Sequence, residues 1–77
     1  MQLPDFLQKF EETFEEITPN SISGNTIYKE LEQWNSMQAL IVIAMIDSDY
    51  GVTIDENDLK SSATASELFE IVKSKFS

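Results

Sequence analysis

The chain has 77 residues and a formal net charge of −9 at pH 7, from 14 Asp and Glu against five Lys. It contains neither Cys nor His, which excludes disulfides, thiolate or imidazole metal ligands, a cysteine nucleophile and a histidine general base. The acidic balance makes contact with nucleic acid or an anionic membrane surface unfavourable, so we expect basic protein partners. A chain this short supports one core, which predicts a single domain over residues 1–77.

The first predicted helix covers residues 3–17. Its apolar side chains recur at spacings of three and four residues, while Glu residues fill the opposite side; the apolar set is Leu3, Phe6, Leu7, Phe10, Phe14 and Ile17. The segment that follows is rich in Ser, Asn and Gly, which predicts a long loop to about Trp34. We expect this loop to pack against the helices through its apolar residues, which are Ile22, Ile27, Tyr28, Leu31 and Trp34.

The second predicted helix covers residues 36–50. Asn35 is a favourable N-cap with Gln38 at the N3 position, and Gly51 is suited to the C-cap. At 100° per residue, one face carries a core stripe, namely Ala39, Val42, Ile43, Ile46 and Tyr50. The opposite side is also apolar. The helix is therefore either buried in the centre of the fold or exposes an apolar patch.

Two more helices are predicted in the C-terminal third. Residues 55–59 can form a single short turn, and the sequence TASE at residues 64–67 is a capping box that begins the last helix. The predicted core face of that helix comprises Ala65, Leu68, Phe69, Val72 and Phe76. The fold class is therefore all-α, a small four-helix bundle with three main helices, one short helix and a long first loop.

The expected location is the cytoplasm. The first 15 residues carry four acidic side chains, which are not typical of a secretory signal peptide. The longest unbroken apolar run, residues 39–46, is shorter than the roughly 20 residues that span a bilayer. We expect no membrane span and a monomer.

Ser36 is the first residue of the predicted second helix. If Asn35 caps the helix, the Ser36 hydroxyl is released from that role and stands at the positive end of the helix dipole, where an attached phosphate is favoured. Spacing alone does not distinguish this from an ordinary cap or surface serine, which is the more common situation.

A wider pattern decides between these interpretations. LEQWNSMQAL at residues 31–40, DYGVTI at 49–54, DENDL at 55–59 and TASELFEIV at 64–72 together resemble an acyl carrier protein over nearly the whole chain. The resemblance implies that Ser36 carries 4′-phosphopantetheine, which a phosphopantetheinyl transferase attaches from coenzyme A. The thiol of this arm would hold acyl or aminoacyl groups as thioesters. The protein would not itself be an enzyme and would have no metal site.

The resemblance also implies that the second helix is the main docking element. The usual Asp-Ser-Leu is Asn35, Ser36 and Met37 here, and acidic positions often found early in this helix are Gln38 and Ile41. Apolar contact would replace part of the charge-guided docking. The expected partner-binding residues are Asn35, Met37, Leu40, Ile41, Ala44 and Asp47.

These departures favour a dedicated pathway, of the fatty-acid or polyketide biosynthesis type, over housekeeping fatty-acid synthesis. The expected partners are the transferase, an acyl- or aminoacyl-loading ligase and downstream biosynthetic enzymes. The main alternative is an unmodified acidic helical adaptor or inhibitor that binds a basic protein.

Two further alternatives are weaker. Residues 47–58 resemble a calcium-binding EF-hand loop in their acids, but Gly51 falls one position early and the last acid is Asp58 rather than Glu. Catalytic carboxylates are not indicated, because Glu15 and Glu16 belong to the solvated face of the predicted first helix.

Overall fold

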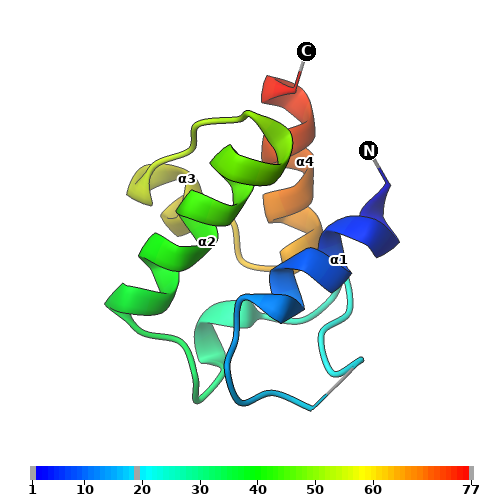
Figure 1. The fold of residues 1–77 in the computed structure, drawn as a ribbon, viewed down its shortest axis with the longest axis vertical. Helices are drawn as coiled ribbons and strands as arrows, with labels where there is room; N and C mark the ends of the chain where they lie inside the picture. Colours follow the sequence, from blue (N-terminus) through cyan, green and yellow to red (C-terminus); the bar gives the residue numbers. More distant parts are fainter. Residues whose placement is uncertain (1, 19, 77) are drawn as a thin grey trace.

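The computed structural model describes residues 2–18 and 20–76, and it is all-helical over these ranges. The elements are α1 (Leu3–Glu12), the 3₁₀ turn η1 (Tyr28–Glu30), α2 (Ser36–Tyr50), α3 (Glu56–Ser61) and α4 (Ala65–Lys75). Figure 1 shows α1 crossing between α2 and α4, and α1 contacts both. The prediction of a four-helix bundle with one short helix and a long first loop is confirmed. Within the described ranges, no helix is long and apolar enough to cross a membrane.

Helix caps follow local sequence closely. The Asn35 side chain accepts a hydrogen bond from the Gln38 amide at 2.8 Å, which leaves Ser36 as the first helical residue. Gly51 ends α2 with a φ of 66°, a left-handed conformation that glycine adopts without steric cost. The predicted capping box of Thr64 and Glu67 is present at the start of α4. These predictions are confirmed.

Helix α1 ends at Glu12, so the prediction that it continues to residue 17 is wrong. The Thr13 hydroxyl donates to the Phe10 carbonyl at 2.6 Å and accepts from the Gln38 side-chain amide at 2.8 Å. The chain turns at this point. Phe14 nevertheless stays buried, because the turn directs its ring towards Phe10, with 5.6 Å between ring centroids.

The core is dominated by aromatic rings. Phe6 and Phe10 of α1 are fully buried. The Phe6 ring lies 5.5 Å from that of Phe69 on α4, and the Phe10 ring lies 5.4 Å from that of Tyr28 in an edge-to-face arrangement, both measured between centroids. The remaining buried apolar residues are Phe14, Ile22, Val42, Ile46, Val52, Ile54, Leu59, Ala65, Leu68 and Val72.

Two predicted packing positions differ from the structure. Ile27 of the long loop is 44% exposed, and Phe76 is 46% exposed because α4 ends at Lys75 and the chain becomes extended there. Ala39, Ile43 and Tyr50 of the predicted α2 core stripe are partly buried and pack against the core.

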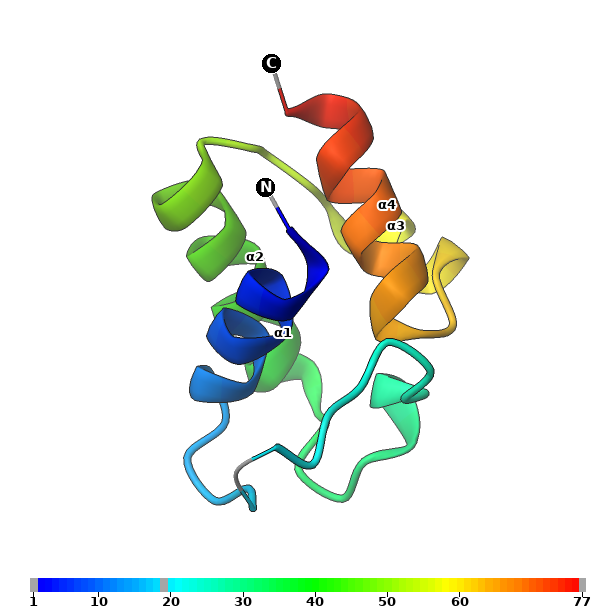
Figure 2. The ribbon, with the colours of Figure 1, turned by 90° about the vertical axis from the view of Figure 1, so that its right-hand side faces the viewer.

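The long loop is tied to the helices at several points. Backbone carbonyls of Gly24 and Thr26 accept hydrogen bonds from the first amides of α4, at 2.9 and 3.0 Å. The Tyr28 hydroxyl lies 2.5 Å from the Ser62 hydroxyl, between α3 and α4. Figures 1 and 2 both show this loop crossing one end of the bundle, next to the start of α2. The loop therefore forms part of the surface around Ser36.

Candidate functional site

Ser36 is an exposed residue at the first position of α2. Asn35 is in an extended conformation and uses its side chain as the cap, so the helix does not need the serine hydroxyl for this purpose. That hydroxyl makes no hydrogen bond to any described residue. The first turn of α2 contains no acidic residue. A group attached to the hydroxyl would therefore face solvent and the unpaired amides of the helix start.

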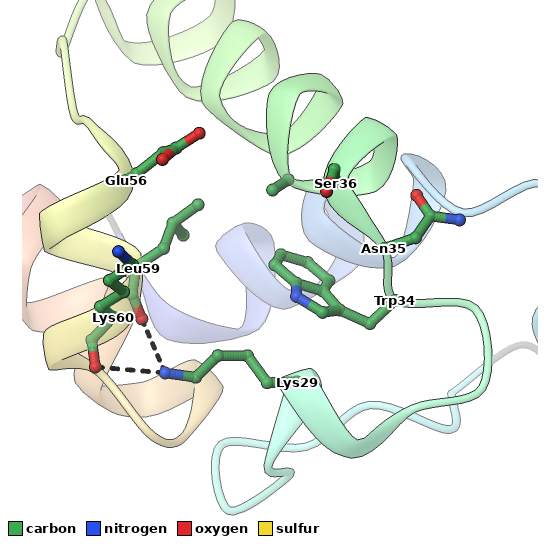
Figure 3. Close-up of a pocket in the computed structure, with 8 residues that line it drawn as sticks. Lys29, Trp34, Asn35, Ser36, Glu56, Leu59 and Lys60 are labelled. Carbon is green, nitrogen blue, oxygen red and sulfur yellow. Dashed lines mark hydrogen bonds between the residues drawn. The ribbon is translucent and has the colours of Figure 1, made fainter.

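A groove of about 380 Å³ opens beside Ser36. It is lined by Lys29, Trp34, Asn35, Ser36, Ala39, Glu56, Leu59 and Lys60, which come from η1, the loop, α2 and α3. In Figure 3 the indole of Trp34 lies between the start of α2 and Lys29, facing α3. The groove thus combines apolar walls with a charged rim.

Trp34 is fixed in place by core aromatics. Its ring centroid lies 5.0 Å from that of Tyr28, in an edge-to-face arrangement, and 6.4 Å from that of Phe14. Such pairs contribute about 0.5–1.5 kcal/mol beyond simple burial. The indole is therefore a preorganised wall of the groove, and its loop-packing role is as predicted.

Two of the five lysines of the chain line this groove. The Lys29 ammonium group donates to the carbonyls of Leu59 at 2.9 Å and Lys60 at 3.2 Å, at the carboxyl end of α3 (Figure 3). This contact holds α3 against η1. Lys60 and Glu56 also line the groove, so its charged side chains are two lysines and one carboxylate, a weakly cationic balance on an otherwise acidic protein.

The six predicted partner-binding residues are all exposed. Met37, Leu40 and Ile41 are 66%, 55% and 39% exposed, whereas Val42 and Ile46 on the other face of α2 are fully buried. The question left open by the sequence is therefore answered: α2 is not enclosed, and it presents an apolar face next to Ser36. Ala44 continues this face, while Asn35 and Asp47 are exposed at its two ends.

Gln38 differs from its neighbours. It is 7% exposed, and its side-chain amide is used to bind Thr13. It therefore does not occupy the surface position that an acidic docking residue would need.

A second groove, of about 290 Å³, lies on the other side of the α2 start. It is lined by Glu15, Glu16, Gln33, Asn35, Met37, Gln38 and Ile41. The sequence pattern placed Glu15 and Glu16 on the solvated face of a longer first helix and did not associate them with Ser36. The early end of α1 brings both glutamates to the start of α2, and no local signal in the sequence indicates this early end.

The acidic side chains Asp55 and Asp58, which follow α2, cap the start of α3. Asp55 caps α3 and forms a reciprocal capping box with Asp58. Hydrogen bonding from the Asp55 amide lowers the pKa of Asp58, with a further contribution from Lys75. Within residues 2–18 and 20–76, no group of three or more acidic side chains is close enough to hold a metal ion.

No family model, curated protein or solved structure matches this chain. The resemblance to acyl carrier proteins is therefore a prediction based on the residues quoted above.

Proposed function

We propose that this protein is an acyl carrier protein that bears 4′-phosphopantetheine on Ser36. The observation that carries the proposal is the exposed Ser36 hydroxyl, which makes no hydrogen bond to a described residue because Asn35 caps α2 in its place. Here the capping and attachment roles belong to two adjacent residues.

The surroundings of Ser36 suit a phosphodiester. The helix dipole and the unpaired amides at the start of α2 favour a negative charge, and no carboxylate of the first turn opposes it. During attachment, the Ser36 oxygen bonds to a phosphorus atom of the coenzyme A pyrophosphate and loses its proton, and adenosine bisphosphate leaves. The transferase supplies the catalysis for this step.

The groove beside Ser36 would hold the arm when it is not engaged with a partner enzyme. Its volume of about 380 Å³ is within the range of about 300–1,000 Å³ that is common for small-molecule sites. Trp34, Ala39 and Leu59 would contact the aliphatic part of the arm, and the lysines of the rim would lie near its phosphate. The thiol, which this chain otherwise lacks, would carry the acyl or aminoacyl group to partner enzymes.

The exposed face of α2 supports docking of those enzymes. Because Gln38 and Ile41 stand at positions that are often acidic, and because Met37, Leu40, Ile41 and Ala44 offer apolar contact instead, we assign the protein to a dedicated pathway of the fatty-acid or polyketide type. It would be loaded by an acyl- or aminoacyl-activating ligase and act as a monomer in the cytoplasm. The protein itself would perform no catalysis.

The test is coexpression with several broad-specificity phosphopantetheinyl transferases, followed by intact mass measurement. The wild type should gain the mass of one phosphopantetheine. Ser36→Ala should gain nothing, whereas Ser48→Ala, which alters another exposed serine of α2, should be modified like the wild type. Trp34 is the only tryptophan, so its fluorescence should change on modification if the arm lies in the groove.

The second candidate is an unmodified acidic adaptor or inhibitor. The exposed apolar face of α2 on a protein of net charge −9 favours it, because this surface can bind a basic partner without any arm. A wild type that stays unmodified with every transferase, yet forms a stable complex with a basic protein, would replace the carrier proposal with this one.

A further inference from the structure

Aromatic rings fill the interior of the helical bundle, and this limits what the protein is able to carry. We propose that its cargo is a short or polar acyl or aminoacyl group, held outside the bundle at the groove beside Ser36 and not between the helices. This choice of cargo rests on the proposed carrier function. The filling of the interior is a property of the fold and can be tested without the arm.

Rings from α1, α2 and α4 occupy the space between these helices. Phe6 and Phe10 are fully buried, and their ring centroids lie 6.0 Å apart in a stacked arrangement. The Phe6 centroid also lies 5.5 Å from that of Phe69 on α4 and 6.0 Å from that of Tyr50 at the end of α2. The aliphatic side chains that complete this layer are fully buried as well, namely Val42, Ile46, Leu68 and Val72. A long alkyl chain would have to displace these groups, and forcing extra methylenes into a packed core is destabilising.

The route from the groove to this interior is closed by Tyr28. Its ring lies between the groove wall and the core, with its centroid 5.0 Å from that of Trp34 and 5.4 Å from that of Phe10. The Tyr28 side chain is fully buried, and its hydroxyl lies 2.5 Å from the Ser62 hydroxyl. The ring is therefore held at both ends. An alkyl chain that passed Trp34 would meet it directly.

Helix α3 forms the other wall of the groove and is held at both of its ends. Figure 3 shows Leu59 of α3 and Ser36 of α2 on opposite sides of the groove. At the carboxyl end of α3, the Lys29 ammonium group donates to two backbone carbonyls, at 2.9 and 3.2 Å. Near its start, the Asp58 carboxylate lies 3.2 Å from the Lys75 ammonium group. Widening the groove towards the core would break these charged contacts.

Cargo that stays outside the bundle must be compatible with water. The groove has a volume of about 380 Å³, which the arm itself would share. The cost of exposing apolar surface grows with its area, so each added methylene favours association of loaded carriers over carriage in water. A short or polar group avoids this cost. The charged side chains that line the groove, Lys29, Glu56 and Lys60, would provide partners for polar atoms of the cargo.

The experiment uses the absence of cysteine from the chain. Ser36→Cys introduces a single thiol, which is coupled as a disulfide to a methyl, octyl or dodecyl group with the corresponding alkyl methanethiosulfonate. Because the interior is filled, Tm should not rise by more than about 2 °C from the methyl to the dodecyl adduct. In ¹³C-methyl NMR spectra, the signals of Ala39 and Leu59 should change with chain length, whereas those of Val42 and Ile46 should not.

A different result in this series would overturn the inference. Burial of three or more methylenes would raise Tm by roughly 10 °C or more. A rise of that size in the dodecyl adduct, together with shift changes at Val42 and Ile46, would show that the bundle accepts a long chain.

Two matched variants test whether the rings are the obstacle. Phe69→Ala, made in the Ser36→Cys protein, opens space beside Phe6, so its dodecyl adduct should melt roughly 5 °C or more above its methyl adduct. Phe69→Leu is the smaller truncation to use if Phe69→Ala does not fold. Phe76→Ala makes the same change at a side chain that is 46% exposed, and its adducts should behave like those of the parent. Equal gains for the two alanine variants, or no gain in either, would overturn the role given to the rings.

Transferase loading keeps this inference distinct from the carrier proposal. The wild type loaded from acetyl- or dodecanoyl-coenzyme A should also show no rise in Tm with acyl length. A chain that no transferase modifies would refute the carrier function and with it the assignment of cargo, whatever the coupled adducts show. A modified chain whose Tm rises with acyl length would refute the assignment of cargo alone.

Discussion

Replacing Tyr28 with Phe removes one buried oxygen atom and should lower the free energy of unfolding by about 1–1.5 kcal/mol. The Tyr28 side chain is fully buried. Its hydroxyl lies 2.5 Å from the Ser62 hydroxyl, 3.0 Å from the Leu59 carbonyl and 3.3 Å from the Ser62 carbonyl. This group joins the long loop to the α3–α4 junction, so its loss should loosen the loop on which Trp34 lies.

The magnitude follows from what the neighbouring groups retain. The Ser62 hydroxyl still has the carbonyls of Asp58 and Leu59 as acceptors, each at 3.2 Å. The Leu59 carbonyl still accepts from the Lys29 ammonium group at 2.9 Å. Among the described hydrogen bonds, only the Ser62 carbonyl loses its last partner, which puts the cost at the upper end of the range for one net hydrogen bond. Tyr28→Ala also removes the ring that packs on Phe10 and should cost about 3–5 kcal/mol.

Urea unfolding followed by far-ultraviolet circular dichroism measures both changes. Each kcal/mol should also lower Tm by roughly 4–8 °C in a domain of this size. A double-mutant cycle with Ser62→Ala should give a coupling of at least about 0.5 kcal/mol. If Tyr28→Phe is as destabilising as Tyr28→Ala, or if the two hydroxyl deletions are simply additive, the hydroxyl does not connect loop and helices as described.

The Tyr28 hydroxyl also predicts a pH dependence. Burial raises the pKa of Tyr28 above its ordinary value of 10.0, Glu67 adds to the rise, and the hydrogen bond with Ser62 partly opposes it. Below pH 10 both states are protonated and the full stability is present. As pH rises from the unfolded pKa towards the folded one, the unfolded chain loses the proton first and stability falls. This part of the alkaline decline should disappear in Tyr28→Phe; Tyr50, whose pKa is also raised by burial, should keep a remainder.

Three further predictions test the helix ends. Gly51→Ala should lower the free energy of unfolding by about 1–2 kcal/mol, measured by chemical denaturation. A φ of 66° is strained for Ala, although no atom lies within 4 Å of the added carbon. An unchanged denaturation midpoint would contradict the left-handed cap. Glu67→Gln should reduce the loss of stability on acidification. Hydrogen bonds from Thr64 and Ala63 lower the pKa of Glu67, so the stability of the wild type falls as pH drops from about 4.5 through the folded pKa. Identical acid titrations of the two proteins would count against the capping box. Phe76→Ala should change the free energy of unfolding by no more than about 0.5 kcal/mol, because the side chain is 46% exposed, and a core-sized loss measured by urea unfolding would show that Phe76 packs inward.

Local sequence was sufficient for most of the helical architecture. The Asn35 cap, the Gly51 terminus and the TASE capping box all lie where the pattern predicts, because each depends on groups within a few residues of one another. The position of Ser36 at the start of α2 follows from the same short-range rules. The candidate attachment site was therefore accessible to sequence reasoning.

The surroundings of that site were less predictable. The walls of the groove beside Ser36 come from η1, α2 and α3, and their approach depends on contacts such as Lys29 with the Leu59 carbonyl, far apart in sequence. Periodicity also could not decide whether α2 is enclosed, because it is apolar on both sides. Its exposed face became visible only from the burial of Val42 and Ile46 against the other helices.

The sequence by itself determined an acidic, all-helical chain with Ser36 at a helix start, since charge, apolar period and capping chemistry act over one or two turns. Only the tertiary structure decided where α1 ends and what surrounds Ser36. Thr13 turns the chain while held by Gln38 from α2, and this places Glu15 and Glu16 in a groove with Asn35 and Met37 at the start of α2. The physical reason is that a hydrogen bond between residues 25 positions apart forms only after the helices have packed.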